Sequence, residues 1–153
     1  MSNFLFYHAE NNPASLSGEV GGSMSETLMT NSLNELFLPV DQLESSIDPF
    51  YQYRKFWVDQ IAGSYTGLYI ELYNVENTGR YSFTTGSETD TATSPTGLPA
   101  GILDGDFLGD ISDTIYIGTG VSGSSFSVWV RQKINSGESP DELDTIGFRI
   151  IEQ

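Results

Sequence analysis

Hydrophobic and polar residues alternate along several short stretches of the chain. In TGLYIELYNVE (residues 66–76), aliphatic side chains occupy every second position, and Tyr69, Glu71 and Tyr73 take the positions between them. SSFSVWVRQKI (124–134) has the same period, with Trp129 and two cations opposite its aliphatic positions. A period of two is the signature of a β-strand with one face on a core. Both stretches are therefore predicted strands.

The same pattern, with β-branched and aromatic enrichment, predicts further strands. They cover residues 3–8, 51–61, 80–86, 114–118 and 144–152. No stretch sustains a helical period over several turns. About seven or eight strands separated by turns predict an all-β fold, a single antiparallel β-sandwich of the Ig-like or jelly-roll-like kind that spans residues 1–153 as one domain.

The segments between these strands are less regular. Residues 1–30, which include the short strand 3–8, are predicted to form a long N-terminal arm. Within this arm, SLSGEVGG can form a brief strand pairing. Residues 25–38 fit either a helix or a strand, and residues 40–47 favour a short helix or turn. ENTG (76–79) is typical of a hairpin turn. Residues 86–113 form a long acidic loop, which five apolar residues are expected to anchor: Ile102, Leu103, Phe107, Leu108 and Ile111.

Charge and composition narrow the class of protein. The 153 residues include 6 Lys or Arg and 21 Asp or Glu, a formal charge of −15. Binding to nucleic acid or to an anionic membrane needs clustered cations, so neither partner is expected. There is no cysteine for a disulfide or a thiolate metal site. The N-terminus lacks a signal-peptide pattern, and no apolar run approaches the ~20 residues that span a bilayer, so we expect synthesis in a cytoplasm.

Catalytic patterns are weak. His8 is the single histidine, and without cysteine any nucleophile–base arrangement would depend on it. A glycosidase pair among the 21 acids cannot be identified from spacing. The sequence predicts a protein that is not an enzyme and that needs no cofactor.

The stretch DGDFLGDISD (104–113) resembles a calcium loop, but its fifth position is Leu108 and its twelfth is Ile115, so the EF-hand pattern fails. A bland acidic loop is favoured over an irregular cation site. The weak candidate ligands for such a site are Asp104, Asp106, Asp110 and Asp113.

Two stripes opposite the predicted core are candidate interfaces, because Tyr, Trp and Arg are enriched in binding hot spots. Their members are Tyr69, Tyr73, Trp129, Arg131 and Lys133. The alternative is ordinary cross-strand pairing within the domain. All six cations fall on predicted strands, whereas most acids fall in loops. A second functional hypothesis is a carbohydrate-binding module in which Tyr69, Tyr73 and Trp129 stack on sugars.

Three segments, YRKFWV (53–58), SVWVRQKINSGESP (127–140) and TIGFRIIE (145–152), together resemble a group of small virion structural proteins of tailed bacteriophages. The resemblance implies a non-enzymatic β-sandwich located in the virion, as capsid decoration or as a head–tail, tail or baseplate component. It also implies that the partners are other virion proteins and copies of the chain. On this hypothesis, the arm (1–30) and the loop (86–113) are candidates for reaching neighbours.

Overall fold

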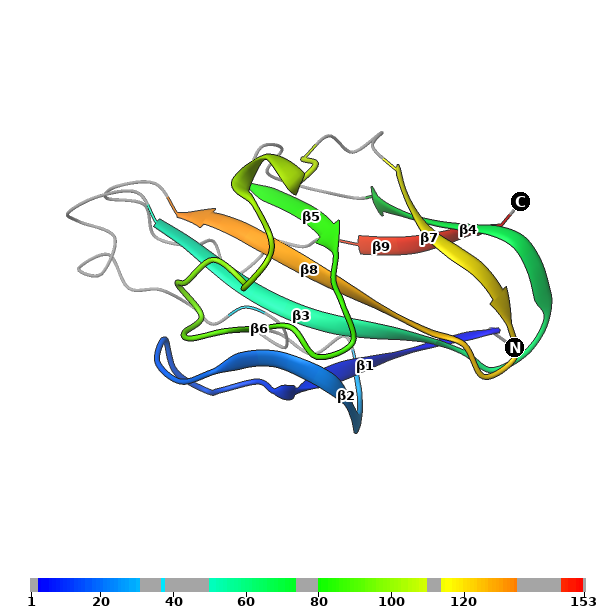
Figure 1. The fold of residues 1–153 in the computed structure, drawn as a ribbon, viewed down its shortest axis with the longest axis horizontal. Coiled ribbons are helices and arrows are strands. Elements are labelled where there is room, and N and C mark those ends of the chain that lie inside the picture. Colours follow the sequence, from blue (N-terminus) through cyan, green and yellow to red (C-terminus); the bar gives the residue numbers. More distant parts are fainter. Residues whose placement is uncertain are drawn as a thin grey trace.

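A computed structural model of the protein describes residues 3–30, 37, 50–73, 80–109, 114–134 and 147–152. Strands dominate these ranges, and one short 3-10 turn, η1 (Asp104–Asp106), interrupts them (Figure 1). The strands are β1 (Phe4–Asn11), β2 (Val20–Leu28), β3 (Phe50–Gln60), β4 (Ser64–Tyr73), β5 (Tyr81–Thr85), β6 (Thr91–Ala92), β7 (Thr114–Val121), β8 (Ser125–Ile134) and β9 (Gly147–Glu152). Within these ranges, no helix is long and apolar enough to cross a membrane.

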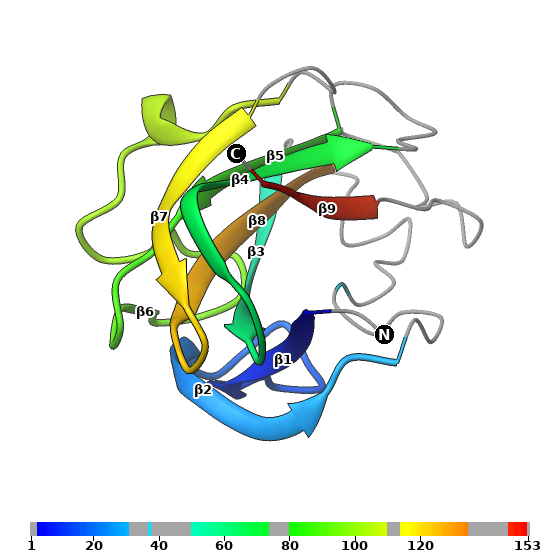
Figure 2. The same ribbon diagram turned by 90° about the vertical axis from the view of Figure 1, so that its right-hand side faces the viewer.

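The strands form two antiparallel sheets that pack together as an all-β sandwich, as the alternation predicts. The larger sheet has the order β5-β8-β3-β1-β2-β6, and the smaller has the order β7-β4-β9. In Figure 2 the smaller sheet lies in front of β8 and β3, while β2 curves round below. Each of the seven predicted strand stretches overlaps one of these strands.

The main core lies between the two sheets. Aliphatic and aromatic residues of β1, β3, β4, β5 and β8 fill it, and Phe148 of β9 packs on Phe56 and Phe83. Its fully buried members include Val58, Leu68, Ile70, Val128 and Val130. These are the aliphatic positions that the period of two assigns to the inner face.

A second apolar cluster lies on the opposite face of the larger sheet. It contains Val20, Tyr53, Ala92, Ile102, Phe107 and Trp129. Residues 86–109, with β6 and η1, supply the covering layer, and β6 pairs with β2 at the sheet edge. The central strands β3 and β8 are consequently buried on both faces, which alternation along one strand does not reveal.

Two expectations for the connecting segments are wrong. The N-terminal arm does not exist as such: β1 pairs with β2 and β3, and β2 runs for nine residues. Of the predicted loop anchors, Ile102 and Phe107 are buried, but Leu103 is 69 % exposed and points into solvent. Leu108 anchors through its backbone, which bridges Phe83.

Other expectations fall outside the described residues. They are the helix or turn at 40–47, the hairpin turn at 76–79, and the anchor Ile111.

Candidate functional site

The buried Lys55 side chain connects three parts of the chain. Its Nζ donates hydrogen bonds of 2.8 Å to the carbonyl oxygens of Gly22 and Ser87, and lies 2.6 Å from Asp90 Oδ1. The ammonium also lies 5.0 Å from the ring centroid of Trp57. Burial lowers the pKa of Lys55, and Asp90 opposes that shift. Lys55 thus holds β2 and the loop after β5 against β3.

Arg54, the neighbouring cation, faces the other side of β3 and is also buried. Its Nη1 donates to Asn12 Oδ1 at 3.0 Å and to the Pro13 carbonyl at 2.9 Å. Burial lowers the pKa of Arg54 to about 10. Its contacts hold the β1–β2 connection against β3, so both cations of the YRKFWV segment support the fold.

The predicted stripe Trp129, Arg131 and Lys133 does not form one exposed surface. Trp129 is 0 % exposed and belongs to the second apolar cluster, so it cannot serve as a stacking platform for a sugar. Its ring packs against the backbone at Gly21 and Gly86, where a Cβ atom would overlap with it. The reason is nonlocal, since the layer that covers Trp129 comes from residues 86–109.

Arg131 is held between two aromatic rings. Its guanidinium carbon lies 4.5 Å from the centroid of Tyr51 and 4.6 Å from that of Phe107. Nε donates to Ser82 Oγ at 3.0 Å, and Nη1 pairs with Asp104 Oδ1 at 3.1 Å. Arg131 is thus paired within the domain, although its partner lies in η1 and not on a neighbouring strand.

On the smaller sheet, Tyr69 packs against a residue that the pattern did not single out. Its ring centroid lies 5.4 Å from that of Tyr116 on β7, which is 52 % exposed. Glu71 on the same strand pairs with Arg149 of β9, an ordinary cross-strand ion pair. The side chain of Tyr73 lies outside the described residues.

The candidate cation ligands are not brought together in the described part of the chain. Asp104 pairs with Arg131, and Asp106 Oδ2 accepts a hydrogen bond from the Leu103 amide. Asp110 and Asp113 lie outside the described residues. Across the described ranges, no group of three acidic or histidine side chains gathers as a metal site would require.

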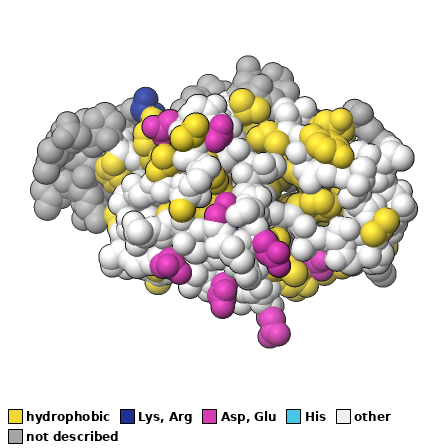
Figure 3. Space-filling view, viewed as in Figure 1, with side chains coloured by type: hydrophobic (Ala, Val, Ile, Leu, Met, Phe, Trp, Pro, Cys, Tyr) yellow, Lys and Arg dark blue, Asp and Glu magenta, His cyan; other side chains and the backbone are white. Residues whose placement is uncertain are grey.

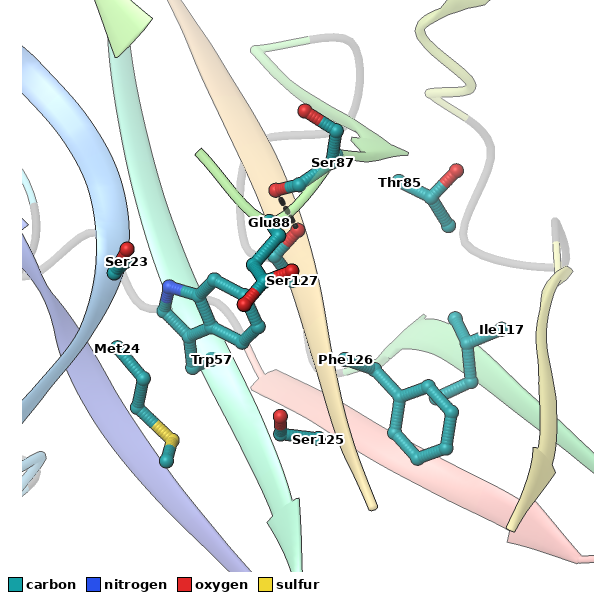
Figure 4. Close-up of a pocket in the computed structure, with 11 residues that line it drawn as sticks. Ser23, Met24, Trp57, Thr85, Ser87, Glu88, Ile117, Ser125, Phe126 and Ser127 are labelled. Atoms are coloured by element: carbon teal, nitrogen blue, oxygen red, sulfur yellow. Dashed lines mark hydrogen bonds between the residues drawn. The ribbon is translucent and has the colours of Figure 1, made fainter. Parts of the chain in front are cut away.

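A pocket of about 560 Å³ opens beside Trp57, where β5 ends and leaves the first residues of β8 uncovered (Figure 4). Hydroxyl side chains from β2, β8, the end of β5 and the segment after it line the pocket: Ser23, Thr85, Ser87, Ser125 and Ser127. Apolar side chains and one carboxylate complete the lining: Met24, Trp57, Ile117, Phe126 and Glu88.

The described lining of this pocket offers hydrogen-bonding groups and one carboxylate. Glu88 is the ionisable side chain among the described lining residues, with no second acid or histidine to form a proton-transfer pair. Ser127 Oγ is committed to the Ser87 carbonyl at 3.0 Å, and the Trp57 indole donates to the Gly22 carbonyl at 3.2 Å. The remaining hydroxyls and the indole ring can meet a neutral polar ligand.

The described residues form an all-β sandwich with a pocket of mixed polar and apolar lining beside Trp57. Comparison of the chain with models of protein families, with curated proteins and with solved structures finds no match. What the protein does must therefore be inferred from its own geometry and chemistry.

Proposed function

We propose that the protein is a non-enzymatic structural component of a tailed-phage virion, which binds neighbouring virion proteins and copies of itself. The resemblance rests on segments that fall in β3, β8 and β9, and β3 and β8 are neighbours at the centre of the larger sheet. Within them, Arg54, Lys55 and Arg131 bind the protein's own loops. Because these three residues of the resembling segments hold the fold together, they support a structural role.

The observation that carries the proposal is the open edge of β7. Within the described residues, this strand is hydrogen-bonded to β4 alone, and its eight residues, TIYIGTGV, contain neither charge nor proline. Tyr116 and Val121 of β7 are among its exposed side chains. Soluble proteins usually blunt such edges with lysine, proline or a cover. The pairing of β7 with β4 is irregular between Tyr65 and Tyr69, but the edge carries no lysine or proline. An uncharged edge in a chain of charge −15 supports strand addition by a neighbouring chain.

This proposal predicts self-association through β7. Purified protein is expected to show a concentration-dependent increase in mass by size-exclusion chromatography with light scattering. The double variant Tyr116→Lys, Thr119→Lys is expected to be monomeric, because two charges on the edge disfavour pairing.

Leu103→Lys is the matched control, because Leu103 is also exposed but lies beside η1. It is expected to associate like the unmodified protein. If the unmodified protein stays monomeric at millimolar concentration, or if the β7 variant associates equally, the edge is not the interface.

The virion assignment has its own test. A gene for a capsid, sheath or baseplate protein beside the gene for this chain is expected, and mass spectrometry of particles from that phage should detect the chain. Particles that lack it would contradict the assignment without affecting the β7 result.

A second candidate function is carbohydrate binding at the Trp57 pocket. Its volume lies in the range of ~300–1,000 Å³ typical of small-molecule sites. Its lining combines several hydroxyls with the Trp57 indole, although Trp57 is only 4 % exposed. This site replaces the predicted platform at Tyr69, Tyr73 and Trp129, of which Trp129 is buried.

If the pocket binds sugar, Ser125→Leu is expected to weaken binding about tenfold, since a lost hydrogen bond and a narrowed pocket remove about 1.4 kcal/mol. A glycan array followed by calorimetry of the retained sugar measures the effect. Ser64→Leu, which changes an exposed serine outside the pocket, is expected to bind normally. An array without any retained glycan would rule this function out.

A further inference from the structure

Three of the six cations of this acidic chain line one small pocket. Arg80, Arg131 and Lys133 surround a space of about 220 Å³, together with Tyr51 and Phe107. On the face shown in Figure 3, dark blue is visible at a single place, at the upper left, with acidic side chains close beside it and others further down. Half of the cations of a chain with a formal charge of −15 are therefore gathered in one place.

The register of the larger sheet creates this gathering. Tyr51 of β3 is directly opposite Lys133 of β8, and the Lys133 amide donates to the Arg80 carbonyl at 2.7 Å. Arg131 lies two residues before Lys133 on the same face of β8. Three positions distant in sequence are thus fixed beside one another by backbone pairing.

The pocket is preorganised. The rings of Tyr51 and Phe107 hold the Arg131 guanidinium between them, and Ser82 fixes its orientation. A cation whose position is already fixed loses little conformational entropy when an anion binds. Arg131 can therefore contribute charge to a ligand without first having to be ordered.

Within the described ranges, the ion pairs of the chain include Arg131 but not Lys133. Among the described residues, Asp104 pairs with Arg131, but its side chain is 74 % exposed and lies at the rim. No carboxylate in the described ranges pairs with Lys133, although the chain holds 21 acids. Lys133 lies on the same strand face as Arg131, and like charges repel, so an anion bound between these two side chains would lower the free energy of the arrangement.

We propose that this pocket binds a carboxylate group, with Lys133 and Arg131 as its partners and the Tyr51 ring as a wall. The size of the space admits a carboxylate and its adjoining methylene groups. Lysine and arginine supply charge-assisted hydrogen bonds to such an oxyanion. The group is carried either by an acidic peptide segment or by a free dicarboxylate. The proposal does not depend on a virion role.

The net charge of −15 opposes the approach of any anion, but that repulsion is long-range. At physiological ionic strength the Debye length is about 8 Å, so distant acids are screened more than cations in direct contact. Binding is therefore expected at about 150 mM salt.

The test uses two probes, an end-blocked tetraglutamate peptide and glutarate, each titrated into the full-length protein and followed by calorimetry. Saturable binding of at least one probe is expected. Lys133→Gln should weaken it about tenfold or more, and Lys133→Arg should largely preserve it. Arg149→Gln is the matched control, because it removes a cation of the smaller sheet, and it should bind normally.

Binding of the peptide alone would assign the site to acidic protein segments. Binding of glutarate alone would assign it to free dicarboxylates, and binding of both probes would assign it to either source. Each of these results supports the proposal. Absence of saturable binding by both probes, or equal affinity in Lys133→Gln, overturns it. Lys133 is only half-buried, and thermal unfolding of each variant checks that the fold is retained.

Discussion

The variant Lys55→Met is expected to unfold with a free energy about 3–5 kcal/mol lower than that of the unmodified protein. Methionine matches lysine in length but supplies no donor. The substitution leaves Asp90 charged in a mostly buried position and removes the hydrogen bonds to Gly22 and Ser87. Urea denaturation followed by tryptophan fluorescence measures the loss, because Trp57 and Trp129 both lie near the Lys55 ammonium.

Two companion variants make the cause specific. Adding Asp90→Asn to Lys55→Met is expected to recover part of the loss, since asparagine removes the unpaired charge and its side-chain oxygen can still accept from the Ser87 amide. Lys133→Met changes the same residue type on the neighbouring strand, where the ammonium is not buried, and should cost about 0.5 kcal/mol or less. Equal losses in Lys55→Met and Lys133→Met would show that the buried connection contributes little.

The lowered pKa of Lys55 gives this contribution a pH dependence. Between the folded-state pKa and the ordinary value of 10.5, the unfolded chain binds more protons at Lys55 than the folded chain does. Stability attributable to Lys55 therefore rises with pH through that window and falls as pH drops through the folded-state pKa. The difference in unfolding free energy between the unmodified protein and Lys55→Met should widen from pH 7 towards pH 10, since other titrating groups cancel in the comparison. A difference that narrows would mean that the ion pair outweighs burial.

The strands were predictable because a period of two depends only on neighbouring residues. In β4, Leu68 and Ile70 occupy the main core as expected, and in β8 Val128 and Val130 do the same. Which residues cover the opposite face of β8 depends on segments that are distant in the sequence. The layer over Trp129 comes from residues 86–109, whose polar and glycine-rich sequence is typical of an exposed loop.

The second strand was hidden for a different reason. In β2, two consecutive glycines interrupt the alternation of apolar and polar residues. The pairing with β1 also shifts register between Tyr7 and Asn11. The sequence of this segment therefore predicts a flexible connection. In the structure, Lys55 and Trp57 both donate hydrogen bonds to the Gly22 carbonyl.

The candidate sites also combine features that follow from local sequence with features that depend on distant segments. That Arg131 and Lys133 share a face of β8 follows from their spacing. That Arg80 and Tyr51 join them needs the register of three strands, which one sequence does not specify. The Trp57 pocket draws on five segments of the chain, and no local pattern could have placed Ser23 beside Ser125.

Gly21→Ala is expected to cost about 3 kcal/mol or more, because two unfavourable terms coincide at one residue. The backbone there has φ +100°, which L side chains rarely adopt. A Cβ atom at this position would also lie 2.6 Å from Cη2 of Trp129 and 2.8 Å from the Asp90 carbonyl oxygen. Neither neighbour can withdraw easily: Trp129 is fully buried, and the Asp90 carbonyl accepts from the Gly22 amide at 2.9 Å.

A second glycine separates the two terms. Gly123 has a similar φ of +94°, but a Cβ there would meet nothing within 4 Å. Gly123→Ala should therefore carry only the backbone strain, about 1–3 kcal/mol, and the additional loss in Gly21→Ala measures the overlap with Trp129. Chemical denaturation of both variants under the same conditions gives the comparison. Equal losses would mean that Trp129 and the Asp90 carbonyl can shift at little cost.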